Sequence, residues 1–281
     1  MTDVIRGDDH LSNTPKQIVI YNALGFEVPK FYHVAMINNP SGKKLSKRDG
    51  AMDVMDYKNL GYLPEALLNF LVRLGWSNGD QEIFSMEEML ELFDPSNINK
   101  SSSSYNGEKL LWLNSEYIKA VSNDRLLEEL KFFDLDLSHH SKKTELLDLS
   151  KQRAQTLVEL KKSITDILEV PTSYEESGVK KFVKEDTKDF LEKYLELLEK
   201  NKDELYNIEN VEAITKPFIH DLGLKFPQLF QPIRIALTGG TQAPSVYDII
   251  AILGFNEVSA RLKEALKRNF QNTWLFNNNL A

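Results

Sequence analysis

A basic segment, Lys44-Leu45-Ser46-Lys47-Arg48, has the clearest chemical character in this sequence. With Lys43 it places four cations within six residues, between glycines at positions 42 and 50. Lysine offers a movable point charge and arginine a planar fork for phosphate oxygens, while the serine hydroxyl can donate a further hydrogen bond. These residue types suit a polyphosphate ligand. A solvated basic loop is the alternative, and the five residues alone leave both interpretations equally open.

A second group of polar residues lies near the N-terminus, in Arg6-Gly7-Asp8-Asp9-His10. Arg6 can bind a carboxylate through two parallel hydrogen bonds. Asp8, Asp9 and His10 could instead cap the helix that follows, and the residues alone favour that interpretation.

Arg234 marks a third candidate, because a polar, glycine-bearing loop (residues 238–242) follows it and precedes a helix N-terminus. Such a loop lets the backbone approach unpaired bases or phosphates closely. A surface arginine that caps a helix is the alternative. Farther on, the stretch RLKEALKR predicts an amphipathic helix, whose cations are expected on a solvated face rather than on RNA: Arg261, Lys263, Lys267 and Arg268.

Two tryptophans, Trp76 and Trp112, adjoin apolar runs and are expected in the core, and Trp274 receives no assignment. The pair His139-His140 lies near two aspartates but shows no ligand spacing, which favours a surface loop. Because cysteine is absent, thiolate zinc sites are excluded. We predict no metal site in this chain.

The elements that must position these residues change in character along the chain. Short strands at residues 4–5 and 31–37 flank a helix in which Thr14 is expected as N-cap and Gln17 as its capping-box partner. This pattern is typical of the end of an α/β unit.

From about residue 57 onward the pattern is helical almost throughout, so we predict a mostly α fold. Pro64 should open one helix, and Ser85 with Glu88 should form a capping box for the next. Residues 96–107, which include four consecutive serines, are expected to be a loop. Further helices are expected at 108–120, 123–134, 144–169, 179–200 and 202–221, followed by a pair that meets at Gly254.

The composition sets wider limits. With 281 residues, 42% hydrophobic and 27% charged, the chain has room for about two or three hydrophobic cores. A net charge of −8 argues against nonspecific nucleic-acid binding through the whole surface, but it leaves local basic patches open. No stretch approaches the roughly 18 consecutive apolar residues of a membrane span. We expect a cytoplasmic protein without a membrane partner.

The basic segment KLSKR resembles the KMSKS signature of class I aminoacyl-tRNA synthetases, in the spelling of the glutamyl/glutaminyl branch. Several long stretches stand in the order and approximate spacing of bacterial glutamyl-tRNA synthetases: VIRGDDHLSNTPKQIVIYNALGF, GKKLSKRDGA, GYLPEALLNFLVRLGWSNGDQEIFS, WLNSEYI and QPIRIALTGGTQAPSVYDIIAILG. The resemblance extends from Val4 to about Leu266.

This resemblance implies ATP-dependent attachment of glutamate to tRNA through a glutamyl-adenylate, with ATP entering together with Mg²⁺. The implied partners are ATP, L-glutamate and tRNA-Glu, and the sequence leaves open whether tRNA-Gln is also charged. Members of the family are typically monomers, and we expect the same here.

The resemblance also implies roles for single residues. Lys47, the second lysine of the signature, would contact the ATP phosphates and act catalytically together with Lys44. The implied ATP-binding set is Lys44, Ser46, Lys47, Arg48 and Asp9. Arg6 would face the glutamate substrate, and Arg234 would contact the anticodon.

One family motif is absent, because none of the five histidines lies in a His-x-Gly-His pattern. We therefore expect a C-terminal fragment that lacks this half of the active site and is inactive alone. A free-standing tRNA-binding module is the alternative. Glutaminyl-tRNA synthetases are disfavoured because they end in β-barrels, whereas residues 108–270 read as helices. A short tRNA-modifying paralogue is disfavoured because it lacks a counterpart of residues 176–281.

Four segments are expected on this basis. Residues 1–56 would be the remnant of a Rossmann-like catalytic domain with the basic loop, and residues 57–120 a helical stem-contact domain. Residues 121–175 and 176–281 would be two helical anticodon-binding subdomains.

Overall fold

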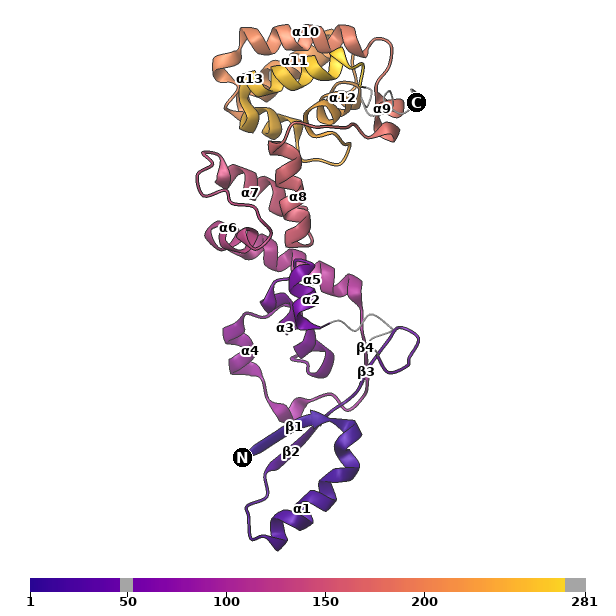
Figure 1. Cartoon of the computed structure of the whole chain (residues 1–281), viewed down its shortest axis with the longest axis vertical. Coiled ribbons are helices and arrows are strands. Elements are labelled where there is room, and N and C mark those ends of the chain that lie inside the picture. Colours follow the sequence, from indigo (N-terminus) through magenta and orange to yellow (C-terminus); the bar gives the residue numbers. More distant parts are fainter. Residues whose placement is uncertain (46–52, 271–281) are drawn as a thin grey trace, which may run out of the picture. The chain divides into compact units, whose positions relative to one another are not determined.

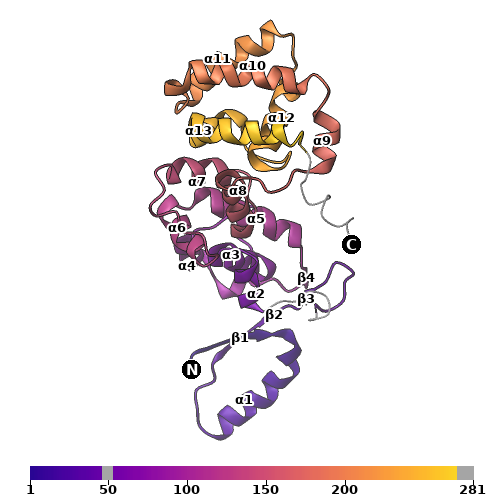
Figure 2. The ribbon, with the colours of Figure 1, turned by 45° about the horizontal axis from the view of Figure 1, so that its top comes forward.

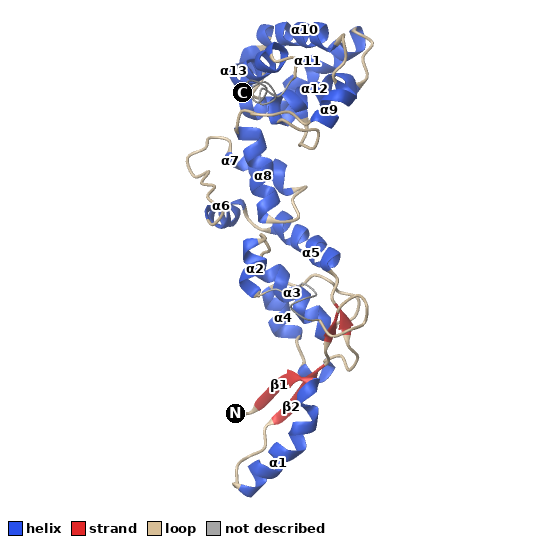
Figure 3. Ribbon diagram, turned by 45° about the vertical axis from the view of Figure 1, so that its right-hand side comes forward, coloured by secondary structure: helices blue, strands red, loops and turns tan. Residues whose placement is uncertain are grey.

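The computed structural model describes residues 1–45 and 53–270, and the chain forms two compact units. Unit 1 comprises Met1–Val121 with Gln155–Val158, and unit 2 comprises Ser122–Ala154 with Glu159–Ala281. Helices make up most of each unit (Figure 3), which confirms the mostly α fold. Within the described ranges, no helix has both the length and the apolar character needed to cross a bilayer.

Unit 1 opens with a β–α–β arrangement, the predicted end of an α/β unit (Figure 1). Strands β1 (Asp3–Gly7) and β2 (Lys30–Val34) pair in parallel, with Arg6 opposite His33. The 3₁₀ helix η1 (Asp8–Asn13) and helix α1 (Thr14–Ala23) connect them. The predicted second strand is split, because β3 (Ile37–Asn38) follows as a separate strand.

The prediction that Thr14 caps α1 is wrong. Because η1 runs directly into α1, Thr14 already has helical dihedral angles (φ −58°, ψ −47°), and Asn13 is the N-cap without a side-chain hydrogen bond. The hydroxyl of Thr14 is instead shared between Arg6 and His33. Thr14 was predicted to precede the helix as its N-cap, but it is the first residue of α1 and links α1 to both strands.

Much of the apolar surface of α1 is uncovered. Val19, Ile20 and Leu24 are 66%, 56% and 62% exposed, and Thr14 is the one buried residue of the helix. Single apolar residues on a surface are ordinary, so these exposures alone assign no partner to the helix.

The rest of unit 1 is helical: α2 (Val54–Asn59), α3 (Pro64–Gly75), α4 (Met86–Leu92) and α5 (Gly107–Ala120). Pro64 opens α3 as predicted, and Ser85 and Glu88 form the predicted capping box of α4. Trp76 is buried as predicted. Trp112 is 41% exposed, so its prediction is wrong. It lies about 200° around α5 from the buried Leu110, on the opposite face.

Buried Asn114 explains why residues 155–158 belong to unit 1. Its Oδ1 accepts from the Leu63 amide at 2.8 Å, and its Nδ2 donates to the carbonyls of Gln155 and Gly61 at 2.6 and 3.3 Å. Gly61 has φ +85°, and a Cβ there would lie 2.7 Å from the backbone nitrogen of Leu157. Glycine is therefore required both by the turn and by the close approach of the two chain segments.

Unit 2 contains the remaining helices: α6 (Asn123–Lys131), α7 (Lys143–Lys151), α8 (Leu157–Leu168, whose first two residues belong to unit 1), α9 (Glu176–Phe182), α10 (Thr187–Lys200), α11 (Ile208–Asp221), α12 (Phe226–Thr238) and α13 (Val246–Lys267). Helices α10 to α13 form one bundle around a common core (Figure 2). The predicted break at Gly254 is confirmed, since its φ of 72° and ψ of 170° interrupt α13.

Two predicted long helices are each divided in two. Residues 144–169 contain α7 and α8, and residues 179–200 contain α9 and α10. Between α9 and α10, the hydroxyl of buried Thr187 accepts from the Lys184 amide at 2.7 Å, which offers the backbone a turn in place of a helical bond. The helix predicted at 202–221 begins at Ile208.

Arg261, predicted on a solvated face, lies in the core of unit 2 and is 2% exposed. Its Nη1 donates to the carbonyls of Ile167 and Leu237 at 2.9 and 2.6 Å, and its Nη2 donates to Leu168 at 2.9 Å. These carbonyls stand at the C-terminal ends of α8 and α12, where helix acceptors lack partners. The prediction fails because helical periodicity cannot show which cation meets the ends of distant helices. Lys263 and Lys267 are exposed as predicted.

Replacing Arg261 with Met should lower the free energy of unfolding by about 2–4 kcal/mol, because three buried carbonyls lose their donors. Urea unfolding followed by circular dichroism measures this change. Arg268→Met is the matched control, since Arg268 pairs with Glu264 on the same helix, and such pairs contribute about 0.3–0.5 kcal/mol. Equal losses in the two variants would contradict the role of Arg261.

Candidate functional site

The basic segment begins at a tight turn organised by Asn39, whose side chain is 9% exposed in total. Its Oδ1 accepts from the Ser41 amide and hydroxyl at 3.1 and 2.8 Å and from the Lys43 amide at 3.0 Å. Gly42 takes a φ of +81°, which completes the turn. Lys43 and the predicted ligand Lys44 are consequently exposed where the basic segment starts.

This turn is anchored to the helices of unit 1 by the serine-rich stretch. Strand β4 (Ser103–Ser104) pairs in parallel with β3, and the hydroxyl of Ser103 donates to the carbonyl of Leu74 in α3. The Tyr105 amide also donates to Asn38 at 2.8 Å. The prediction of a plain loop at 96–107 is therefore wrong, because the small hydroxyl side chains let the backbone join β3.

Ser46, Lys47 and Arg48 lie outside the described residues. The amide of Leu45 donates to the carbonyl of Ile37 at 2.9 Å, and an antiparallel bridge joins Asn38 to Lys44. The structure therefore describes the basic segment only as far as Leu45, where the chain leaves the turn.

Arg6 lies near the end of β1, and two contacts define its position. Its Nη2 donates to Thr14 Oγ1 at 2.7 Å, and its guanidinium lies 5.0 Å from the centre of the Phe31 ring. Its Nε is buried without a hydrogen-bond partner among the described residues. The side chain also lines a pocket of about 510 Å³ beneath α1. A fixed guanidinium with spare donors is suited to bind a carboxylate.

Asp9 lies in η1 and is exposed. Its carboxylate packs against Gly7, where a Cβ would lie 2.5 Å from Asp9 Oδ1. The glycine between Arg6 and the acidic residues therefore lets this carboxylate lie close to the end of β1.

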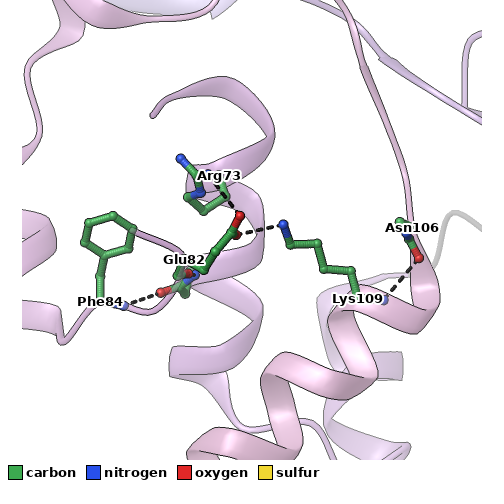
Figure 4. Close-up of polar contacts among 6 residues, drawn as sticks. Arg73, Glu82, Phe84, Asn106 and Lys109 are labelled. Atoms are coloured by element: carbon green, nitrogen blue, oxygen red, sulfur yellow. Dashed lines mark hydrogen bonds and ion pairs between the residues drawn. The ribbon is translucent and has the colours of Figure 1, made fainter. Parts of the chain in front are cut away.

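A charged cluster that sequence analysis did not single out joins α3 to α5 (Figure 4). Glu82 lies between Lys109 and Arg73, with Oε2 2.7 Å from the ammonium and Oε1 3.4 Å from Nη2. The hydrogen bond from Lys109, aided by Arg73, holds the pKa of Glu82 below its usual value. Buried Asn69 fixes this stretch by donating to the Glu82 carbonyl at 2.9 Å and accepting from the Phe84 amide at 2.8 Å. These contacts hold the connection between α3 and α4 in place.

In unit 2, Arg234 lies on α12 and faces the end of the loop that follows. Its Nη2 donates to the carbonyl of Pro244 at 3.3 Å, and Arg153 Nη1 donates to that of Ala243 at 3.0 Å. Burial, followed by the charge of Arg153, lowers the pKa of Arg234. An arginine remains charged despite such a shift. Sequence analysis missed Arg153 because it fell inside a predicted continuous helix.

Glu175 holds the other end of this loop. Its Oε2 accepts from the amide and hydroxyl of Thr241 at 2.8 and 2.7 Å. A hydrogen bond from the Ser177 hydroxyl, together with those from Thr241, lowers the pKa of Glu175. Gly239 ends α12 with a φ of +81°, and a Cβ there would lie 2.9 Å from the carbonyl of Ser173.

Gln242 lies at the middle of the anchored loop and lines two adjacent hollows. One, of about 340 Å³, also contains Arg153 and Lys162. The other, of about 420 Å³, contains Lys162 again with Glu175. A polar amide in such a position can hydrogen-bond a base edge or a phosphate. The hollows beside the loop carry charges of both signs, because Glu159 and Asp166 lie among the cations, and Lys162 pairs with Asp166 at 2.5 Å.

Two family models match this chain. The model of the catalytic domain of class I tRNA synthetases for glutamate and glutamine matches residues 1–112. The model of an anticodon-binding domain matches residues 108–266. The two matches together cover both basic sites described above.

Curated relatives agree with these models. Glutamate–tRNA ligase 1 of Aliarcobacter butzleri is 85% identical over 97% of this chain, and glutamate–tRNA ligase 1 of Campylobacter hominis is 53% identical over 95%. The chain spans only 58% and 57% of the length of these two relatives.

Solved structures show the same similarity. A glutamate–tRNA ligase from Elizabethkingia meningosepticum, crystallised in complex with its amino acid, matches with a TM-score of 0.83 at 28% identity, over 95% of this chain and 57% of that one. The synthetase from Elizabethkingia anophelis matches with a TM-score of 0.78 at 28% identity over the same shares.

Replacing Asn39 with Ala should open the turn, because three donors lose their shared acceptor. Amide exchange of Ser41 and Lys43, measured by NMR or by mass spectrometry of the 37–45 peptide, should accelerate by about tenfold or more. Asn39→Asp keeps the accepting oxygen and should retain most of the protection. Unchanged exchange in Asn39→Ala would show that the backbone alone maintains the turn.

Proposed function

The chain belongs to the class I tRNA synthetase family for glutamate and glutamine, and from this premise we propose that it is part of a glutamate–tRNA ligase. The observation that carries the proposal is the joint match of the catalytic model and the anticodon model along one chain. Because the chain spans 58% of its relative from Aliarcobacter butzleri, the activity is proposed for the enzyme that this chain completes.

In the proposed reaction, a glutamate carboxylate attacks the α-phosphorus of ATP and pyrophosphate leaves. The glutamyl group then passes to the 3′-terminal ribose of tRNA-Glu. ATP enters as its Mg²⁺ complex. Lys47 and Lys44 neutralise the charge that develops on the leaving pyrophosphate, while Ser46 and Arg48 bind phosphate oxygens.

Arg6 binds the glutamate substrate in this proposal. Support comes from its hydrogen bond to Thr14, its contact with Phe31 and its position on a pocket of about 510 Å³. Asp9, exposed on η1 directly beyond β1, is assigned to ATP binding.

Arg234 binds the anticodon, and the structure adds Arg153 and the anchored loop as support for that assignment. Residues 57–120 are assigned to the tRNA stem and residues 121–175 and 176–281 to the anticodon arm. A cytoplasmic monomer is proposed, and whether tRNA-Gln is a second substrate stays open.

A free-standing tRNA-binding module is the second candidate function. The observation that supports it is the match of the anticodon-binding model over residues 108–266, more than half of the chain. Under either candidate the chain alone is expected to bind tRNA and not to form an adenylate, because holding both reactants in place supplies much of the rate acceleration.

The chain should bind labelled tRNA-Glu with an affinity that falls steeply as salt rises, because phosphate contacts release counterions. Arg234→Ala should weaken binding by about tenfold to a hundredfold. Lys263→Ala removes the same charge from an exposed position on α13 and should have little effect. Titration by fluorescence anisotropy at two salt concentrations measures both. If the chain bound no tRNA at either salt concentration, both candidate functions would be excluded.

The catalytic role of Lys47 can be measured in a chimera in which this chain replaces the matching 58% of the Aliarcobacter butzleri ligase. Lys47→Ala should lower glutamate-dependent ATP–pyrophosphate exchange by about 10²–10³-fold, since a preorganised contact to the leaving group is lost. The affinity for tRNA should stay the same. Lys43→Ala is the control, because its side chain carries the same charge at the turn and should cost far less. Exchange rates equal to those of the parent chimera would remove Lys47 from the mechanism.

A further inference from the structure

The hydrogen bond that holds the Arg6 guanidinium goes to a neutral hydroxyl. Its Nη2 donates to Thr14 Oγ1 at 2.7 Å, and Thr14 is only 9% exposed. A hydroxyl rotates freely unless its other bonds are fixed. The orientation of the guanidinium therefore depends on what else holds Thr14.

His33 supplies that second contact. Its Nε2 lies 2.9 Å from Thr14 Oγ1, whereas the carbonyl of His10 lies 3.4 Å from the same oxygen. Since the hydroxyl accepts from Arg6, it donates its proton either to His33 or to His10, and in the latter case His33 donates to it. In both arrangements the imidazole fixes the hydroxyl.

Three different elements meet at this point. Arg6 and His33 stand opposite one another on the paired strands β1 and β2, and Thr14 is the first residue of α1. Phe31, also on β2, lies against the guanidinium. We call His33, Thr14 and Arg6 the relay. Through it, the pairing of the two strands determines where the remaining N–H donors of Arg6 point.

We propose that His33 is a positioning residue for glutamate recognition: through Thr14 it orients the Arg6 guanidinium so that two of its N–H groups can meet a substrate carboxylate. This inference rests on the proposed function, because it takes the ligand of Arg6 to be glutamate. Bidentate recognition is sensitive to small rotations of the planar fork, so a loosened guanidinium binds the carboxylate less tightly.

The relay itself can be tested by NMR on this chain as it stands. In the parent protein, restrained rotation of the Arg6 guanidinium should give separate signals for its Nη protons. His33→Ala and Thr14→Val should average these signals, whereas Thr14→Ser keeps the hydroxyl and should preserve them. His33→Gln, whose amide can reach the position of Nε2, should also preserve them. Separate signals in His33→Ala would overturn the proposal.

The functional consequence can be tested by pyrophosphate exchange in the chimera described above. His33→Ala should raise the KM for glutamate by about tenfold, with little change in the KM for ATP, because one hydrogen bond in the relay is lost. His33→Gln should restore most of the affinity. The double variant His33→Ala/Thr14→Val should be no worse than Thr14→Val alone, since both act through one hydroxyl.

The outcomes separate this inference from the proposed function. A parent chimera with no glutamate-dependent exchange would count against the proposed function, and the NMR signals of Arg6 would still decide whether the relay exists. An active parent with an unchanged glutamate KM in His33→Ala would overturn the positioning role alone. Thermal unfolding of each variant shows whether a loss of stability accompanies the change, and a purely structural role would not raise the KM for one substrate selectively.

Discussion

The parallel pairing of β1 with β2 is the constraint on which the first half of the site depends. It fixes Arg6 opposite His33, and α1 returns over the pair so that Thr14 meets both. The chain then leaves β2 at Val34 and reaches β3 three residues later. The turn that starts the basic segment is therefore connected to this strand pair by a short stretch of chain, which suits the site for two reacting ligands that we propose.

Buried polar side chains hold the junctions between elements throughout the molecule. Asn39 fixes a turn, Asn114 joins Gly61 to Gln155, and Arg261 receives the ends of two helices. In each case the partner is a backbone group that secondary structure leaves unpaired. Such groups are costly when buried alone, so these side chains specify where a helix or turn must end. Hydrophobic residues fill the core of each unit, and the buried polar contacts fix the junctions between its helices, strands and turns.

The same contacts set the limit of what the sequence could predict. Local signals worked: Pro64, the box of Ser85 and Glu88, and the break at Gly254 each act within one turn of helix. The failure at Arg261 involves a partner far away in the chain, a carbonyl 94 residues distant. The division of the helix predicted at 179–200 is a local failure, because the turn between Lys184 and Thr187 was not recognised. The same holds for the candidate site. Its motif residues could be named from the sequence, whereas Arg153 and His33 were identified only from their contacts in the structure. The roles assigned to Lys47 and its neighbours stay predictions.

Charge distribution resolves the apparent conflict between a net charge of −8 and the RNA partner that we propose. Acidic residues spread over exposed helix faces act on a distant polyanion through water and salt, which screen them beyond about 10 Å. Arg234 differs, because it is partly buried and donates to the carbonyl of Pro244, next to the Ala243 carbonyl that accepts from exposed Arg153. A guanidinium in that setting keeps its charge and is screened less. Local burial, and not the overall charge, therefore determines where a polyanion is attracted.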